Sequence, residues 1–143
     1  MEINEITSDV IGAAMKVHTA LGLGLLERPY EICLLHELRK RGLKAESQVE
    51  LPVIYDSVRM EIGYRLDLVV EDLVIVERKA AEAITPVYEA HLLSYLELSG
   101  KPVGLLINFH VKHLRDGIKR FVEGIRRGWE KPLRASVPSV VKN

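Results

Sequence analysis

The sequence predicts a mixed α/β fold in which a central β-sheet of about four strands is flanked by helices. Apolar residues recur at helical spacing in some segments, and alternate or run continuously over strand-length stretches in others. The first three strands follow one another directly, and the third of them also begins a strand–helix–strand unit. We therefore expect an antiparallel meander and a parallel pair with a right-handed crossover, in the order α-α-β-β-β-α-β-α.

Two helices are predicted before the first strand. The apolar stripe of the first consists of Ile6, Val10, Ala13, Ala14, Val17 and Leu21. Thr7 or Ser8 is available as its N-cap, and Gly22 ends it. The second helix is expected over residues 26–41, with Pro29 tolerated in the first turn, where its missing N–H costs little. This places Glu27 near the helix start.

Four strands and two further helices follow. Residues 48–55 predict a strand, which Pro52 assigns to a sheet edge or a bulge. Strands are also expected over 59–70, 73–79 and 103–109, the last a continuous apolar run typical of a central strand. Thr85 caps a helix that ends at Gly100. A final helix is expected over residues 111–129.

Composition indicates one globular domain without disulfides. The chain has 143 residues, 48% of them apolar, no net charge and a single cysteine. We expect a domain over residues 1–130 and a partly disordered tail over 131–143. No apolar run is long enough to span a bilayer, so a cytoplasmic location is expected. Residues 112–143 carry nine Lys/Arg against three Asp/Glu, a weak indication of a polyanionic partner or simply a solvated face.

Charged residues bound the most apolar stretch of the chain, residues 65–80. Asp67 enters one strand, and Glu77 and Lys79 close the next. A two-residue turn at Glu71-Asp72 would place Asp67 opposite Val76, with Glu77 on the other face. A three-residue loop or a bulge would instead place Asp67 opposite Glu77.

In that second register, Asp67 and Glu77 would repel each other unless a divalent cation lay between them. Oxygen-rich sites of this kind suit Mg²⁺ or Mn²⁺. Lys79, two residues beyond Glu77, would share its face. The alternative is a pair of strand ends that merely enter and leave solvent.

Asp, then about ten residues, then Glu-x-Lys is the pattern of the PD-(D/E)xK nuclease superfamily. Gly24-x-x-Glu27-x-x-Tyr30 matches the motif of the GxxExxY proteins. The chain also resembles that family at residues 17–24, at Gln48 and at four later stretches, 64–68, 77–80, 91–96 and 104–109. The similarity ends at residues 117–120 and covers roughly residues 5–122.

This resemblance implies a restriction-endonuclease-like fold and a metal-dependent phosphodiesterase site. Glu27, Asp67 and Glu77 would be metal ligands, and Lys79 the catalytic lysine. His91 and Tyr95, four residues apart on a helix, would line the cleft. Arg78, Lys119 and Arg120 are candidate contacts to nucleic acid.

Three positions depart from the family pattern. His91 replaces a more usual Gln, Arg78 stands where an apolar residue is commoner, and Leu23 stands where Pro is usual. All three leave the Asp, Glu and Lys set in place.

The sequence therefore predicts a metal-dependent nuclease acting on DNA, with RNA as the less favoured substrate and a homodimer expected because one small neutral domain engages a duplex weakly. The alternative is a nucleic-acid-binding or protein-interaction module that keeps the fold but has little catalysis.

Overall fold

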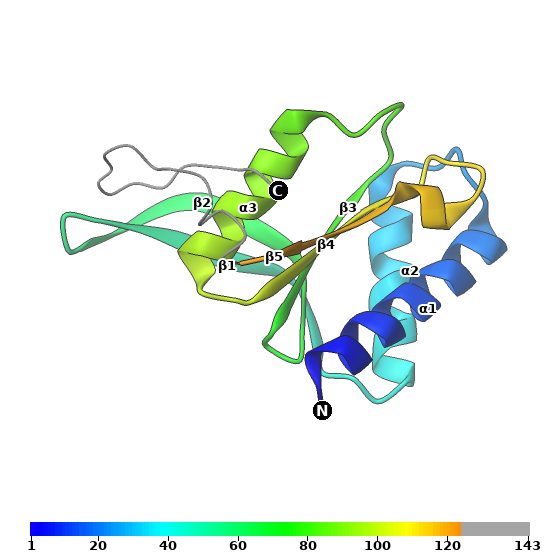
Figure 1. The fold of residues 1–143 in the computed structure, drawn as a ribbon, viewed down its shortest axis with the longest axis horizontal. Helices are drawn as coiled ribbons and strands as arrows, with labels where there is room; N and C mark the ends of the chain where they lie inside the picture. Colours follow the sequence, from blue (N-terminus) through cyan, green and yellow to red (C-terminus); the bar gives the residue numbers. More distant parts are fainter. Residues whose placement is uncertain (124–143) are drawn as a thin grey trace.

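A computed structural model describes residues 1–123, in which a twisted five-stranded sheet is covered by helices on both faces (Figure 1). Two helices lie against one face and a third lies across the other. The elements in chain order are α1 (Ile3–Leu21), α2 (Glu27–Lys40), β1 (Ala45–Tyr55), β2 (Val58–Val70), β3 (Val74–Lys79), α3 (Pro86–Ser99), β4 (Val103–Asn108), the 3₁₀ helix η1 (Leu114–Gly117) and β5 (Ile118–Val122). The predicted mixed α/β class is confirmed.

The predicted helices are present with small changes at their ends. Helix α1 begins earlier than expected, because Glu2 and Glu5 form a capping box and neither Thr7 nor Ser8 is the N-cap. In α2, Glu27 is the first helical residue and Pro29 lies in the first turn, as expected. Helix α3 has the predicted limits, with the Thr85 hydroxyl accepting a hydrogen bond from the Tyr88 amide.

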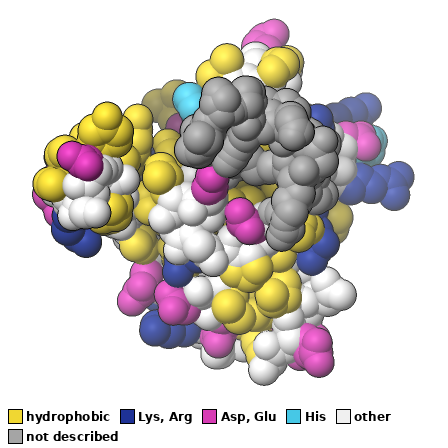
Figure 2. All heavy atoms as spheres, turned by 60° about the vertical axis from the view of Figure 1, so that its left-hand side comes forward, with side chains coloured by type: hydrophobic (Ala, Val, Ile, Leu, Met, Phe, Trp, Pro, Cys, Tyr) yellow, Lys and Arg dark blue, Asp and Glu magenta, His cyan; other side chains and the backbone are white. Residues whose placement is uncertain are grey.

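The sheet has the order β1-β2-β3-β4-β5, antiparallel except for the parallel pair β3–β4. Strand β1 is an edge strand whose register shifts between Leu51 and Val53, so Pro52 lies at the predicted edge and bulge. Beyond the sheet body, β1 and β2 continue as a two-stranded ribbon (Figure 1). Apolar side chains are exposed on this ribbon, and Figure 2 shows them gathered on a projecting lobe.

The connection between β2 and β3 is a three-residue loop, Glu71-Asp72-Leu73. Its first two residues adopt positive φ values of 53° and 58°, and Val70 pairs with Val74 across it. The register continues through Leu68–Val76, so the next pair along the two strands is Asp67 and Glu77. This is the offset register that a shared carboxylate site requires.

The predicted final helix over residues 111–129 is wrong within the described residues. The chain instead forms η1 and then β5, which pairs antiparallel with β4. Strand β4 is buried along its whole length, and the backbone groups on its far edge would lack partners without β5. The spacing of Leu114, Ile118 and Phe121 fits a helix, but the demand for backbone pairing outweighs it. Residues 124–129, like the predicted tail, lie outside the described residues.

Two apolar cores lie on the two faces of the sheet. One packs α1 and α2 against the sheet around Val10, Leu34, Leu68 and Ile107. The other packs α3 against the sheet around Ile75, Leu92 and Leu96. Within residues 1–123, no helix is long and apolar enough to cross a membrane.

Gly117 allows η1 to approach the end of β4, and we predict that Gly117→Ala destabilises the fold. A Cβ at this position would lie 2.3 Å from the Asn108 carbonyl oxygen, so the backbone would have to move. We expect a loss of about 1–3 kcal/mol in the free energy of unfolding, measured by urea denaturation.

The matched control is Gly12→Ala in α1. There the nearest atom is the guanidinium of Arg41, a flexible side chain, and alanine favours a helix interior over glycine. This variant is expected to be as stable as the wild type or more so. Equal free energies of unfolding for Gly117→Ala and Gly12→Ala would contradict the close approach at Gly117.

Candidate active site

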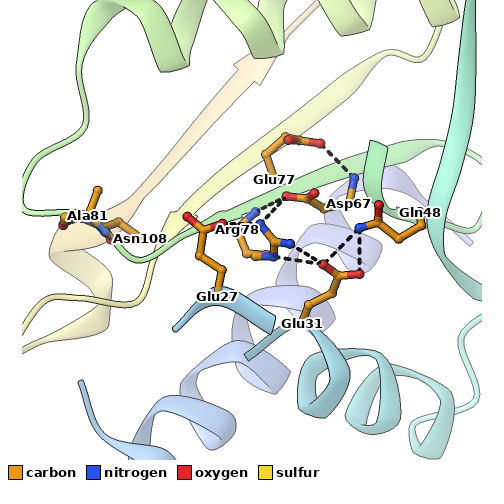
Figure 3. Close-up of polar contacts among 8 residues, drawn as sticks. All are labelled: Glu27, Glu31, Gln48, Asp67, Glu77, Arg78, Ala81 and Asn108. Carbon is orange, nitrogen blue, oxygen red and sulfur yellow. Dashed lines mark hydrogen bonds and ion pairs between the residues drawn. The ribbon is translucent and has the colours of Figure 1, made fainter. Parts of the chain in front are cut away.

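Two buried carboxylates from neighbouring strands form the centre of the site. Asp67 on β2 and Glu77 on β3 are only 9% and 7% exposed. The Asp67 amide donates to Glu77 Oε2 at 3.0 Å, and the Arg78 amide donates to Asp67 Oδ2 at 3.0 Å (Figure 3). Each carboxylate thus takes a backbone hydrogen bond from the opposite strand, which fixes the pair where β2 and β3 separate.

Burial and proximity make this pair reluctant to ionise fully. Burial, followed by the charge of Asp67, raises the pKa of Glu77 to about 8. Burial also raises the pKa of Asp67, although the nearby Arg78 guanidinium opposes this. Burial therefore disfavours full ionisation of the pair near neutral pH.

Lys79 and Tyr95 lie beside the carboxylate pair. The charge of Lys79 favours ionisation of both Asp67 and Glu77, and its ammonium lies 4.6 Å from the centre of the Tyr88 ring. Burial, and then the Glu77 charge, raise the pKa of Tyr95. The structure thus brings four of the predicted residues, Asp67, Glu77, Lys79 and Tyr95, to one site.

His91 lies at the outer edge of this group. Its side chain is exposed, and its ring is roughly parallel to that of Tyr95, with centroids 6.4 Å apart. Tyr95 also contacts Tyr64 of the β1–β2 ribbon, at a centroid distance of 6.0 Å. These rings line the side of the site that faces α3.

Arg78 joins the site to helix α2. Its side chain is 14% exposed and contacts three carboxylates (Figure 3). Nη1 lies 2.7 Å from Glu27 Oε1 and 3.5 Å from Asp67 Oδ2, and Nη2 lies 2.8 Å from Glu31 Oε1. Gln48 on β1 donates to both oxygens of Glu31, at 3.2 and 3.0 Å. One guanidinium therefore connects α2, β2 and β3.

Glu27 is held by Arg78 and does not join Asp67 and Glu77 as a third converging carboxylate. Within residues 1–123, no three His, Cys, Asp or Glu side chains form a group that could hold a metal ion. The structure thus brings together two of the three predicted ligands. Arg78, predicted as a nucleic-acid contact, has its guanidinium occupied by carboxylates.

Lys119 and Arg120 lie on a strand and not on the predicted final helix. They are adjacent on β5, so their side chains point to opposite faces of the sheet. Lys119 pairs with Glu89 of α3, and Arg120 donates to Asn4 of α1 at 3.0 Å. Their role in nucleic-acid binding stays a prediction.

Asn108 holds the chain that leaves the site. It is 2% exposed, and its side-chain amide exchanges two hydrogen bonds with the backbone of Ala81, at 3.0 and 2.9 Å. The Phe109 amide donates to the Lys79 carbonyl at 2.8 Å. These bonds continue the β3–β4 pairing beyond the last strand residue and so position Lys79.

Sequence reasoning did not assign roles to Glu31 or Asn108. Glu31 lies four residues after Glu27, on the same face of a helix, and this spacing could have identified it. Asn108 is the polar end of an otherwise apolar strand, a position where a buried amide needs partners.

The carboxylate pair fits a divalent cation. Asp67 and Glu77 supply the oxygen donors that Mg²⁺ and Mn²⁺ prefer. Burial and then the charge of Asp67 raise the pKa of Glu77, and a bound cation would neutralise the negative charge of the pair. Cation binding at this pair would displace the proton from Glu77.

The fold and site together define a mixed-sheet protein with a carboxylate pair and a lysine at the ends of adjacent central strands, an arrangement typical of nucleases. A family model described as the PD-(D/E)XK nuclease superfamily matches residues 4–121. The chain therefore belongs to the PD-(D/E)XK nuclease superfamily, whose members generally use divalent metal ions. Comparison with curated proteins and with solved structures found no match.

We predict that Arg78→Met strongly destabilises the protein. Removal of the guanidinium leaves Glu31, which is 1% exposed, without its charged partner. We expect a loss of about 3–5 kcal/mol in the free energy of unfolding. The double variant Arg78→Met/Glu31→Gln should recover much of this loss, because the buried charge is gone.

Arg59→Met is the control, because Arg59 forms an exposed pair with Glu61 and its loss should cost less than about 1 kcal/mol. If the Arg78 and Arg59 variants were equally stable, the ion-pair cluster would not be a major stabilising feature.

Glu77 should make the metal-free protein less stable as pH rises. Its folded-state pKa lies above its ordinary value of about 4.5, so the folded state favours the protonated form. The resulting stability is complete below pH 4.5 and is lost as pH rises through about 8. In thermal unfolding experiments in EDTA, the Tm should fall less between pH 5 and pH 8 for Glu77→Gln than for the wild type. Parallel curves for the two proteins would contradict the raised pKa.

Proposed function

We propose that this chain is a nuclease that hydrolyses phosphodiester bonds in DNA, with Mg²⁺ or Mn²⁺ as its cofactor. One observation carries the proposal. The three-residue loop between β2 and β3 places Asp67 beside Glu77, so that the Asp67 amide donates to the Glu77 carboxylate, with Lys79 beside the pair. Membership of the nuclease superfamily supports this interpretation.

Within the superfamily, we infer that the chain is a GxxExxY protein. The motif residues have structural tasks that fit one another. The Tyr30 hydroxyl donates to the Gly22 carbonyl at 2.6 Å and accepts from the Leu25 amide at 3.2 Å, so it holds the loop that leads into α2. Gly24 has a φ of +108°, which favours glycine. Together these residues place Glu27 at the start of α2, within reach of Arg78.

The charged side chains of the site would have different roles in the reaction. Asp67 and Glu77 would hold the divalent cation, each oriented by the backbone amide that it accepts. The cation, when bound, supplies charge that polarises a phosphate oxygen and lowers the pKa of a water. Lys79 would present its Nζ to the phosphate and stabilise the negative charge that develops there.

The aromatic residues control the surroundings of these charges. Tyr88 lies under the Lys79 ammonium and restricts its positions. Tyr95 remains a neutral phenol near the carboxylates, because its pKa is raised, and it can donate a hydrogen bond to a substrate oxygen. His91, exposed beside Tyr95, is placed to contact a substrate that enters from solvent.

Cleavage of a panel of nucleic acids tests the proposal. The panel contains single-stranded, duplex and branched DNA and an RNA of matched sequence, each with Mg²⁺ or Mn²⁺. We expect cleavage of DNA by the wild type, and a rate at least about 10²-fold lower for Lys79→Met and for Asp67→Asn. RNA should be cleaved more slowly than DNA.

Lys40→Met is the matched control for Lys79→Met, because Lys40 is an exposed lysine at the far end of α2 and should leave the rate unchanged. Binding without cleavage across the whole panel would favour the binding-module alternative. Cleavage that persists in both site variants would refute the assignment of the site.

A further inference from the structure

A group of basic side chains lies outside the carboxylate site, in the segment between β4 and β5. This segment and the end of α1 line a pocket of about 290 Å³. Its polar lining consists of His18, Thr19, Lys112, His113 and Arg115. Met15 and Leu114 complete the lining that residues 1–123 provide, and none of these lining residues is a carboxylate.

The basic side chains of this pocket are unpaired within the described part of the chain. Lys112, His113 and Arg115 are exposed, and their side chains make no hydrogen bond or ion pair with another residue of the range 1–123. The neighbouring acid Asp116 does not line the pocket. Elsewhere in the fold, by contrast, Lys101 and Lys119 each pair with a carboxylate. The pocket thus concentrates positive charge that residues 1–123 do not neutralise.

His18 fixes the shape of the pocket. Its Nε2 donates to the Val111 carbonyl at 2.8 Å, a bond that joins residues 93 positions apart in sequence. The same ring lies 6.4 Å from the Phe109 ring, which stacks on Tyr30 in the core. The basic segment is therefore attached to α1 at a defined position, and the pocket is formed by two parts of the fold.

The pocket lies at the same end of the sheet as the catalytic lysine, although α1 covers the face opposite to α3, against which the Lys79 ammonium packs. Strands β3 and β4 are parallel, and Lys79 pairs with Asn108. The basic segment starts at Lys112, four residues after Asn108 and three after Phe109, whose amide donates to the Lys79 carbonyl. A polyanion bound at the carboxyl ends of these strands would meet both features.

The chemistry of the lining selects phosphate. Lysine, arginine, histidine and a threonine hydroxyl are the side chains that contact phosphate oxygens in nucleic-acid complexes. Among residues 1–123, no Phe, Tyr or Trp lines the pocket, so this part of the chain offers no such platform for stacking a base. Such a pocket would recognise the backbone and be indifferent to sequence.

We propose that this pocket, formed by the end of α1 and residues 112–115, binds a backbone phosphate of the nucleic-acid substrate. The proposal rests on the proposed function, because it assigns the anion to the substrate strand. His18 is a positioning residue that holds the basic segment, and Lys112 and Arg115 are the principal phosphate contacts.

Binding of fluorescently labelled DNA, followed by anisotropy in EDTA at 50–200 mM KCl, tests the proposal without cleavage. The probes are a 20-nucleotide single strand and the matching duplex. Lys112→Ala/Arg115→Ala should weaken binding about 10-fold at the lower salt concentration. It should also reduce the slope of log affinity against log salt by about 1 to 2.

The matched control is Lys40→Ala/Lys44→Ala, which also removes two exposed positive charges. Lys40 is the last residue of α2, and Lys44 lies four residues beyond it. It should change affinity less than 2-fold, and circular dichroism should show both double variants folded. Equal weakening by the two variants would show an effect of net charge alone and would overturn the proposal. So would unchanged binding in the pocket variant, or no binding of either probe by the wild type.

Two further outcomes separate this proposal from others. If the wild type bound inorganic phosphate, the pocket variant did not, and both bound DNA equally, the pocket would be a small-anion site and the proposal would fail. Because the readout is binding in the absence of metal, a protein that never cleaves could still show the predicted loss. Conversely, normal DNA binding by a pocket variant would leave the nuclease proposal intact and refute only this one.

Discussion

The ion pairs of Arg78 are the interaction on which the geometry of the site depends. The guanidinium is nearly buried and contacts carboxylates from α2 and β2, while its own backbone amide holds Asp67. Glu31, more deeply buried than Arg78, takes further hydrogen bonds from Gln48. A buried ion pair of this kind gains little over an apolar packing, but the loss of one partner is costly. The cluster therefore acts chiefly to fix the position of α2 relative to the sheet.

This cluster also determines how charge is distributed around the site. Glu27, Glu31 and Asp67 contribute three negative charges near Arg78, which neutralises one of them. Glu77 responds to its burial and to Asp67 by holding a proton, as its pKa of about 8 indicates. An excess of carboxylates over internal cations is the electrostatic condition for binding a divalent ion. Helix α2 thus contributes to the site through charge, although Glu27 itself is held away from the central pair.

Most of the fold could be predicted from the sequence because its elements have strong local signals. Thr85 with Pro86, the glycines after the helices and the alternation in β1 each correspond to an observed boundary or strand. The prediction of a final helix was wrong because the spacing of Leu114, Ile118 and Phe121 is compatible both with a helix and with the observed 3₁₀ helix and strand. The choice between them depends on unpaired backbone groups of β4, a long-range requirement that local periodicity does not express.

The site shows the same division between local and long-range information. Asp67, Glu77 and Lys79 are identifiable from their pattern, and the approach of Asp67 to Glu77 follows once the loop length is known. The ion pair between Glu27 and Arg78 could not be predicted, because it depends on where α2 lies over the end of β3. A charged residue between Glu77 and Lys79 was a visible departure, but only the three-dimensional structure assigns its partners.

The loop Glu71-Asp72-Leu73 has a consequence for how related sequences should be sorted. Because side chains alternate along a strand, one residue fewer in this loop would place Asp67 opposite Val76 and on the other face from Glu77. A relative could then retain the Asp and the Glu-x-Lys motif in full and still lack an assembled carboxylate pair. The parity of the β2–β3 connection is therefore a criterion for separating intact sites from remnants, and it can be applied by counting residues.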